Sequence, residues 1–271
     1  MACPPKTQMK RNSRPTPDDL RDRPPAEDWV FGLHAVEALL KHHADNIEQL
    51  LVQQGRHDQR IEPLIQRAHK LHIDVNEASK TEFDERIGGV HQGIAARCRN
   101  LKLERSEGFL QQLLEGLDHP PFLLVLDGVT DPHNLGACLR TAEAAGVDAV
   151  IVPKDKSALM TPTVRKVACG AAEVVPFIAV TNLARTLKHL QDQRIWIFGA
   201  AGEAEQSIYQ TDLRGPLALV LGSEGAGMRR LTREHCDHLV RLPMTGEMES
   251  LNVSNAAAVA LYELARDAPG G

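Results

Sequence analysis

The chain has 271 residues, of which 42% are hydrophobic and 25% are charged, a composition typical of globular proteins. This length suits one large domain or two smaller ones, and length and composition together exclude a disulfide-stapled miniprotein, a collagen-like chain and a wholly disordered chain. The formal net charge of −5 argues against a globally basic nucleic-acid-binding protein, so any contact with RNA has to be local. Aromatic residues are only 4% of the chain, which argues against a base-stacking surface.

The five cysteines are scattered and form no CxxC pair, so a zinc site is not indicated. Their odd number suits a reducing compartment, and we expect a cytoplasmic protein that holds no metal ion. No apolar run approaches the roughly 20 residues that a membrane-spanning helix needs, and the first residues lack the apolar core of a secretory signal. We therefore expect no association with a membrane.

Residues 1–28 combine prolines and charges with almost no apolar residues, which predicts a disordered tail. From residue 29, apolar residues recur with the periods of alternating short strands and helices. Strands are predicted at 29–32, 48–54, 73–78 and 91–99, and helices at 33–43, 61–72 and 79–87. We interpret residues 29–104 as a small α/β domain, and residues 105–120 as a linker that contains a short helix.

A second domain is predicted over residues 121–271. It opens on FLLVLDGV (122–129), a nearly continuous apolar run that is typical of a parallel strand covered on both faces. Further strands are predicted at 147–153, 176–180, 194–201, 217–225 and 238–244, and helices at 135–146, 161–173, 183–191 and 251–267. This alternation predicts an α/β fold with an open parallel sheet and helices on both faces.

The first of three polar segments at predicted strand ends is DPHNLGACLRTAEAAG (131–146). Open α/β sheets bind their ligands at such ends. Asn134 stands where a helix N-cap is expected and Gly146 where the helix should end, so capping alone would explain both. Arg140 is more informative, because it is a lone cation in a helix of mostly Leu, Ala and Cys, four residues after Gly136. A surface arginine is the alternative.

The second segment is LVLGSEGAGM (219–228). Its glycines at 222, 225 and 227 permit positive φ angles and a close approach of the backbone to a ligand. Neither GxGxxG nor GxxxxGK[ST] is present, so a dinucleotide site or a P-loop ATP site is not supported. A tight turn is the alternative, but turn chemistry does not explain Glu224 in the middle of the segment.

The third segment is RLPMTGEMESLNVSNAAAVALYE (241–263). Ser250 could simply cap the final helix. Yet Ser250, Asn252, Ser254 and Asn255 place four polar side chains within six residues of an apolar helix, although Ser and Asn are mediocre helix formers. An apolar wall beside them is predicted from Leu242, Met244 and Leu251.

In this order and spacing, the segments resemble the three motifs of the SpoU/TrmH branch of the SPOUT superfamily, which contains RNA ribose 2′-O-methyltransferases. The first motif is matched by Asn134, Gly136 and Arg140, the second by residues 221–225 with Gly227, and the third by residues 243–244 and 250–254. FGLHAVEALL (31–40) and VHQGIAARC (90–98) resemble the substrate-binding domain of the subgroup that methylates a guanosine ribose in bacterial 23S rRNA. Each motif alone is weak, whereas the three in order are specific.

The resemblance implies several properties that periodicity does not show. The C-terminal segment would thread a loop to form a trefoil knot, an exception to the general absence of knots. The cofactor would be S-adenosylmethionine, and the protein would be a homodimer with the site near its interface. The implied substrate is 23S rRNA, bound by the first domain, with tRNA as the alternative.

The resemblance also implies roles for the matched residues. The family assigns the activation of the ribose hydroxyl to Arg140, with help from an RNA phosphate. A guanidinium seldom loses its proton, so holding the phosphate and stabilising the developing alkoxide is physically easier. The residues that would orient Arg140 or the ribose are Asn134, Glu224, Ser250 and Asn252. The cofactor would contact Ala200, Gly222, Leu242, Met244 and Leu251. A Cβ at Gly222 is expected to collide with it or to force an unfavourable φ.

Two other classes of function stay open. A nucleotide-binding oxidoreductase would share the parallel sheet and the glycine-rich segment, but it lacks its fingerprint here. A non-catalytic RNA-binding module for ribosome assembly would use the first domain and would tolerate the loss of Arg140. Binding of S-adenosylmethionine tests the oxidoreductase reading, and methyl transfer tests the non-catalytic one.

Overall fold

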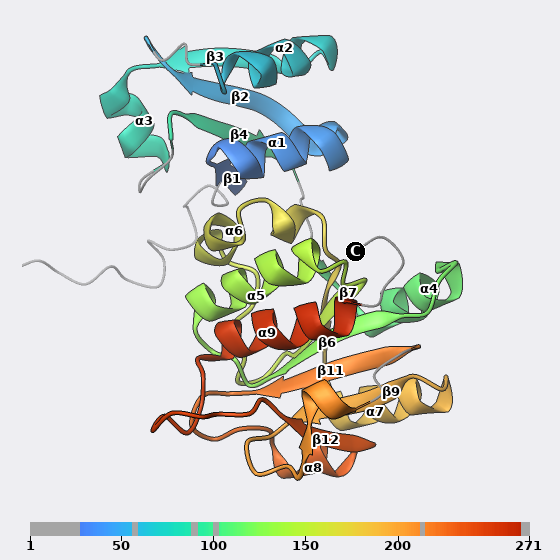
Figure 1. Cartoon of the computed structure of the whole chain (residues 1–271). Coiled ribbons are helices and arrows are strands. Elements are labelled where there is room, and N and C mark those ends of the chain that lie inside the picture. The colour runs from blue at the N-terminus through green and yellow to red at the C-terminus, as the bar shows by residue number, and fades with distance from the viewer. Residues whose placement is uncertain (1–27, 56–58, 88–91, 100–102, 212–214, 267–271) are drawn as a thin grey trace, which may run out of the picture.

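The computed structural model describes residues 28–55, 59–87, 92–99, 103–211 and 215–266. The tail predicted at residues 1–28 lies outside this part of the chain except for its last residue. Two α/β units, each with its own sheet, follow one another along the chain (Figure 1). Each unit also has its own buried core. Within the described residues, no helix is both long enough and apolar enough to cross a bilayer.

The front unit holds a four-stranded sheet in the order β1-β4-β2-β3. Its elements are β1 (Asp28–Phe31), α1 (Leu33–His42), β2 (Ile47–Gln53), α2 (Glu62–Lys70), β3 (Asp74–Ala78), α3 (Lys80–Ile87) and β4 (Ile94–Cys98), with a 3-10 turn at Ala44–Asn46. β4 runs antiparallel to both neighbours, whereas β2 and β3 are parallel. Helices α1 and α2 pack on one face of the sheet, and Phe83 of α3 is buried on the other.

The second unit holds an eight-stranded sheet in the order β10-β12-β9-β11-β6-β7-β8-β5, and every described pair in it is parallel. The strands are β5 (Glu104–Arg105), β6 (Phe122–Asp127), β7 (Ala149–Pro153), β8 (Phe177–Val180), β9 (Trp196–Ala200), β10 (Gln206–Ser207), β11 (Leu217–Gly222) and β12 (His238–Arg241). The predicted parallel sheet is therefore confirmed.

Helices cover both faces of this large sheet, as predicted. They are α4 (Glu107–Gly116), α5 (Pro132–Ala144), α6 (Pro162–Ala168), α7 (Leu183–Asp192), α8 (Arg230–Glu234) and α9 (Val253–Ala265). Helices α5, α6 and α9 pack on one face with Leu124 and Leu126 of β6, and α4 and α7 pack on the other with Leu123 and Val125. Because both faces are buried, β6 reads as a continuous apolar run.

The helix predicted at 161–173 is interrupted. It ends at Ala168, because Cys169 and Gly170 take left-handed φ angles of 52° and 97°, which an α-helix does not accommodate. A separate 3-10 turn follows at Ala171–Glu173. The predicted strands at 217–225 and 238–244 are also shorter, ending at Gly222 and Arg241. The sequence did not predict β5, β10, α8 or the 3-10 turn at Ile208–Gln210.

Residues 103–105, where the predicted linker begins, belong to the second unit and its large sheet. Strand β5 pairs with β8, Leu103 is buried, and the Glu104 carboxylate accepts a hydrogen bond from the Met160 N–H at 2.9 Å.

The front unit contacts the turn that follows α6. His43 Nε2 lies 2.7 Å from the carbonyl oxygen of Glu173. A Cβ at Gly170 would lie 2.9 Å from the carbonyl oxygen of His34 in α1. The glycine therefore permits close contact between the two units.

Candidate functional site

A cavity of about 530 Å³ lies at the carboxyl ends of β9, β11 and β12. This volume is in the range of small-molecule sites, and the place is where parallel sheets bind their ligands. All five residues that the resemblance assigned to the cofactor line the cavity: Ala200, Gly222, Leu242, Met244 and Leu251. The structure thus brings together residues from three strand ends that are far apart in the sequence.

The loop after β11 is closed by its own backbone. Ser223 N–H donates to the Gly227 carbonyl at 3.1 Å, and Gly227 N–H donates to the Ser223 carbonyl at 2.9 Å. Gly225 and Gly227 have φ angles of 78° and 68°, a conformation that side chains disfavour. These two glycines therefore serve the turn itself.

The structure gives a reason for glycine at position 222 that does not depend on a ligand. Its φ is not in the left-handed region, so backbone conformation does not require glycine there. A Cβ at this position would lie 2.1 Å from the Gly227 carbonyl carbon and 2.2 Å from the Met228 nitrogen. The Cβ would thus collide with the backbone of the returning loop, which forms the cavity wall, before any ligand is considered.

One predicted polar residue from each motif joins a single cluster, in which Asn134 and Asn252 both contact Glu224. Asn134 Nδ2 donates to Glu224 Oε1 at 3.0 Å, and Asn252 Nδ2 lies 2.5 Å from the same oxygen. Asn252 Nδ2 also lies 3.0 Å from Asn134 Oδ1. The Val253 N–H adds a longer contact to Glu224 Oε1 at 3.3 Å. Because Glu224 also lines the cavity, this polar cluster of Asn134, Glu224 and Asn252 stands at the cavity's edge.

The helix caps differ from the expected ones, and this difference explains the polar cluster. Asp131, not Asn134, is the N-cap of α5, and its carboxylate accepts the His133 N–H at 3.0 Å. The amide of Asn134 is therefore available to Glu224. Asn252, not Ser250, caps α9 by accepting the Ser254 N–H at 2.9 Å. Ser250 is exposed and lines the cavity instead.

Arg140 lies apart from the polar cluster of its own chain. It is exposed on α5, and its Nη1 is 3.7 Å from Cys169 Sγ at the end of α6. It follows Asn134 by six residues, which places it about 9 Å further along the helix axis and on a different side of the helix. Gly136, between them, serves packing, because a Cβ there would lie 2.7 Å from Val167 Cβ of α6.

Besides Glu224, the cavity is lined by three charged side chains that the sequence did not reveal, Glu203, Arg233 and Glu249. Arg233 and Glu203 form an ion pair. Hydrogen bonds from the backbone N–H of Glu203 and from the Arg233 guanidinium hold the pKa of the Glu203 carboxyl below its usual range, so it stays charged. Arg233 belongs to α8, a five-residue helix too short to leave a periodic signal.

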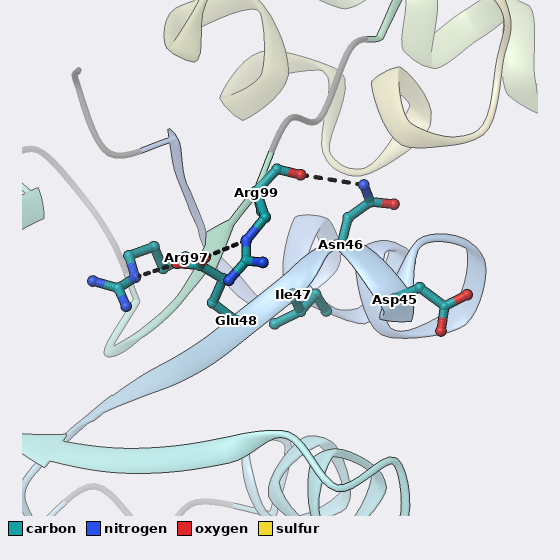
Figure 2. A pocket seen from close by; sticks show the side chains of 6 residues that line it. All are labelled: Asp45, Asn46, Ile47, Glu48, Arg97 and Arg99. Atoms are coloured by element: carbon teal, nitrogen blue, oxygen red, sulfur yellow. Dashed lines mark hydrogen bonds and ion pairs between the residues drawn. The ribbon is translucent and has the colours of Figure 1, made fainter.

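The front unit has a cleft of its own, of about 380 Å³ (Figure 2). Glu48 bridges two guanidiniums there, with its oxygens 2.9 Å from Arg97 Nε and 2.7 Å from Arg99 Nε. The bond from Arg99 is the main cause of a lowered pKa of the Glu48 carboxyl. The cleft's charged side chains are Asp45, Glu48, Arg97 and Arg99, so the charges of its lining balance.

The described cysteines are free thiols in different surroundings. Burial raises the pKa of Cys138 and Cys236 to about 12, so neither thiol is a nucleophile at neutral pH, whereas Cys169 is exposed. In the part of the chain that the structure describes, no group of three or more His, Cys, Asp and Glu side chains is arranged to hold a metal ion.

Comparison with known proteins gives matches over both units. Residues 121–262 match the SpoU rRNA Methylase family, and residues 29–103 match the family described as RNA 2′-O ribose methyltransferase substrate binding. The chain is 57% identical over 237 residues to the 23S rRNA (guanosine-2′-O-)-methyltransferase RlmB of Pseudomonas putida, which covers 88% of this chain and 95% of that protein. The protein of the same name from Escherichia coli K12 is 52% identical over 240 residues, covering 88% and 98%.

Solved structures agree on the fold. The crystal structure of an RNA 2′-O ribose methyltransferase has a TM-score of 0.72 at 27% identity, covering 88% of this chain and 87% of that one. The SpoU methyltransferase AviRb from Streptomyces viridochromogenes, in complex with AdoMet, has a TM-score of 0.72 at 20% identity, covering 90% and 91%. The arrangement of the two units is therefore similar to that of known RNA methyltransferases.

Proposed function

Because the chain belongs to the SpoU rRNA methylase family, we propose that it methylates the ribose 2′-hydroxyl of a guanosine in 23S rRNA with S-adenosylmethionine. The observation that carries the proposal is the meeting of Asn134, Glu224 and Asn252 at the edge of the cavity. The chain matches nearly the full length of two relatives that are 57% and 52% identical to it. Both are named 23S rRNA (guanosine-2′-O-)-methyltransferase, which favours rRNA over tRNA as the substrate. A non-catalytic module would have no need of the cluster.

The cavity suits S-adenosylmethionine in its volume and in the chemistry of its lining. Leu242, Met244 and Leu251 would give an apolar wall for the adenine, and the backbone of residues 222–228, which also lines the cavity, would offer polar groups to its edge. Arg233 and the lining carboxylates Glu203 and Glu249 are complementary to the charged amino-acid end of the cofactor. When bound, the cofactor would supply a methyl group attached to a cationic sulfur. Because this sulfur leaves as a neutral thioether, the leaving group needs no activation by a metal ion.

The residues of the chain then have to orient and activate the ribose hydroxyl. Glu224, with the two asparagine amides on one of its oxygens, is held rigidly beside the cavity and can orient the ribose. Positioning the two reactants in line supplies much of the rate. As the new C–O bond forms, the C–S bond of the cofactor breaks and the hydroxyl proton is released to solvent. Arg140 holds the RNA phosphate and stabilises the developing alkoxide, a role that suits a permanently charged planar fork.

Two measurements test the function directly. The purified protein with S-adenosylmethionine should transfer methyl groups to 23S rRNA and not to tRNA. In a strain that lacks the gene, mapping of ribose methylation should show the loss of a 2′-O-methyl group at a guanosine of 23S rRNA. Methylation lost from tRNA instead, with rRNA unchanged, would overturn the substrate assignment.

We also propose that the front unit selects the RNA. Its cleft presents Arg97 and Arg99, residues of the type that binds phosphates and guanine edges, fixed in place by Glu48 (Figure 2). The cleft gives this unit a specific polar surface rather than a general positive patch. Selection by shape and position is consistent with the balanced charge of the lining.

Removing residues 1–102 is expected to preserve the fold of the second unit and its binding of S-adenosylmethionine, while kcat/KM on 23S rRNA falls by about tenfold or more. The cut precedes Leu103 because Leu103 is buried and Glu104 pairs with Phe177 in the large sheet. Calorimetry with the cofactor and steady-state methylation check the two halves of the expectation. An unchanged kcat/KM would show that the front unit does not select the substrate.

The homodimer is part of the same proposal. Val259 and Tyr262 lie one turn apart on α9, and they are 39% and 57% exposed. Large apolar side chains on one exposed helix face are typical of an interface. Arg140 lies on a different side of α5 from Asn134, and a site near the interface could combine Arg140 of one copy with the polar cluster of the other.

A mass measurement in solution should give two chains per particle, and Tyr262→Glu should shift the particle toward one chain because it places a charge in the interface. Leu231→Glu is the matched control, because Leu231 is 51% exposed on α8 and outside the proposed interface. An active wild-type protein that is monomeric at assay concentration would contradict the homodimer. The trefoil knot and a cytoplasmic location stay predictions.

A further inference from the structure

A buried carboxylate ends the central strand β6 next to the cavity. Asp127 is the last residue of β6, and its side chain is 0% exposed. It accepts three contacts from one residue: Arg229 N–H at 2.8 Å on Oδ2, and Arg229 Nε and Nη2 at 2.5 Å each on Oδ1. A buried carboxylate is costly unless it is paired and hydrogen-bonded in this way.

The two residues enclose the loop that forms the cavity wall. We name residues 223–228 the glycine loop. At its start, Gly222 is the register partner of Asp127 in the parallel pair of β11 and β6. At its end, Arg229 is bonded to the same aspartate through both its backbone and its side chain. Both ends of the glycine loop are thus fastened at one residue of the central strand.

We propose that Asp127 and Arg229 are positioning residues for methyl transfer, because they set the place of the glycine loop and with it the cavity wall and Glu224. The inference rests on the proposed function, since the loop bears on catalysis only through the cofactor and the ribose. Neither residue lines the cavity, so they act through the loop and not by contact with a ligand.

The chemistry of the pair explains why these two residue types are needed. A carboxylate can accept the backbone N–H on one oxygen and the guanidinium on the other, whereas an amide in its place has one acceptor oxygen. A planar guanidinium presents Nε and Nη2 together, which a lysine cannot do. The Arg229 side chain is 45% exposed, so its truncation opens no buried cavity, and Asp127 keeps the bond from the Arg229 N–H.

Arg229→Ala is the main test, with Arg229→Lys as the conservative variant. The first readout is hydrogen exchange of the ligand-free protein. Amides of residues 223–228 should exchange faster in Arg229→Ala, since the side-chain anchor is lost, while those of β6 should not. The second readout is calorimetric affinity for S-adenosylmethionine, expected to fall by about tenfold in Arg229→Ala and by less in Arg229→Lys.

Asp148→Asn is the matched control. Asp148 also accepts a backbone N–H from β6, that of Phe122 at 2.8 Å, but at the opposite end of the strand. This variant should lower the apo melting temperature without changing exchange in the glycine loop or the cofactor affinity of the folded protein. Equal effects of the two variants on cofactor affinity would show that general strand stability, and not loop position, is responsible, and would overturn the proposal.

The proposal would also be overturned if Arg229→Ala changed neither amide exchange in the glycine loop nor the affinity for S-adenosylmethionine. Failure of the wild-type protein to bind S-adenosylmethionine would instead contradict the proposed function. Faster amide exchange of the glycine loop in Arg229→Ala would even then show that Arg229 holds the loop in place. A split in the kinetics gives a further check: Arg229→Ala should raise KM for the cofactor and lower kcat, because Glu224 moves with the loop.

Discussion

Arg140→Ala is expected to abolish methyl transfer while cofactor binding stays close to that of the wild type. Arg140 is exposed on α5 and is not part of the cavity lining, so its loss removes the charge that we propose acts on the ribose and leaves the walls of the cavity unchanged. Arg140→Lys should not restore activity, because a point charge does not replace a planar fork on a phosphate. Transfer of labelled methyl groups to 23S rRNA and calorimetry with S-adenosylmethionine measure the two effects.

Arg185→Ala is a suitable control for this experiment. Arg185 is also an exposed helical arginine, in α7 on the opposite face of the sheet, where it pairs with Glu107. Its removal should leave turnover unchanged. Near wild-type turnover in Arg140→Ala would end the assignment of Arg140 to the reaction and would favour the non-catalytic reading of the chain.

Gly222→Val should weaken the binding of S-adenosylmethionine by at least about tenfold, or about 1.4 kcal/mol. The added Cβ meets the Gly227 carbonyl carbon and the Met228 nitrogen at 2.1 and 2.2 Å, and backbone atoms cannot rotate away as a side chain can. The glycine loop therefore has to move and to distort the cavity wall. Calorimetry on the folded variant measures the loss of affinity.

Destabilisation alone could imitate this loss, so thermal unfolding of the ligand-free variant is needed beside it. Gly170→Val serves as a control: its Cβ would lie 2.9 Å from the His34 carbonyl oxygen, at the contact with the front unit and away from the cavity. It should lower the melting temperature and leave cofactor affinity unchanged. Wild-type affinity in a well-folded Gly222→Val would move the cofactor site away from this loop.

Much of the fold could be predicted because the apolar pattern is unambiguous. The run of β6 is buried on both faces, and the alternation of strands and helices leaves few arrangements other than a parallel sheet. The elements that escaped prediction are short. Strands β5 and β10 have two residues each and α8 has five, lengths at which neither period can be recognised.

The candidate site was predicted as a set of residues but not as a geometry. Capping was the alternative explanation for Asn134 and Ser250, and the structure shows that Asp131 and Asn252 are the caps instead. The Asp131–Pro132 pair carried the signal for the first cap, because proline favours the first helical position. For the second, Ser and Asn are equally good caps, and only the packing of α9 decides between them.

The surroundings of Arg140 could not be predicted. Its neighbour Cys169 faces it only because the chain leaves the helix at a left-handed Cys169, and a cysteine in that conformation has no sequence signature. Asp127 did carry a signal that was overlooked. A charged residue that ends an otherwise apolar buried strand requires a partner, and Arg229 lies 102 residues away along the chain.

The spacing of the polar cluster along the chain sets the order in which the protein can become functional during synthesis. Asn134 meets Glu224 across 90 residues and Asn252 across 118, so the cluster closes only after the start of α9 has left the ribosome. The described front unit is complete by residue 99 and can fold well before that. A nascent chain would therefore carry the surface proposed to select RNA long before the proposed active site is complete. Contacts of such long sequence separation are expected to form slowly.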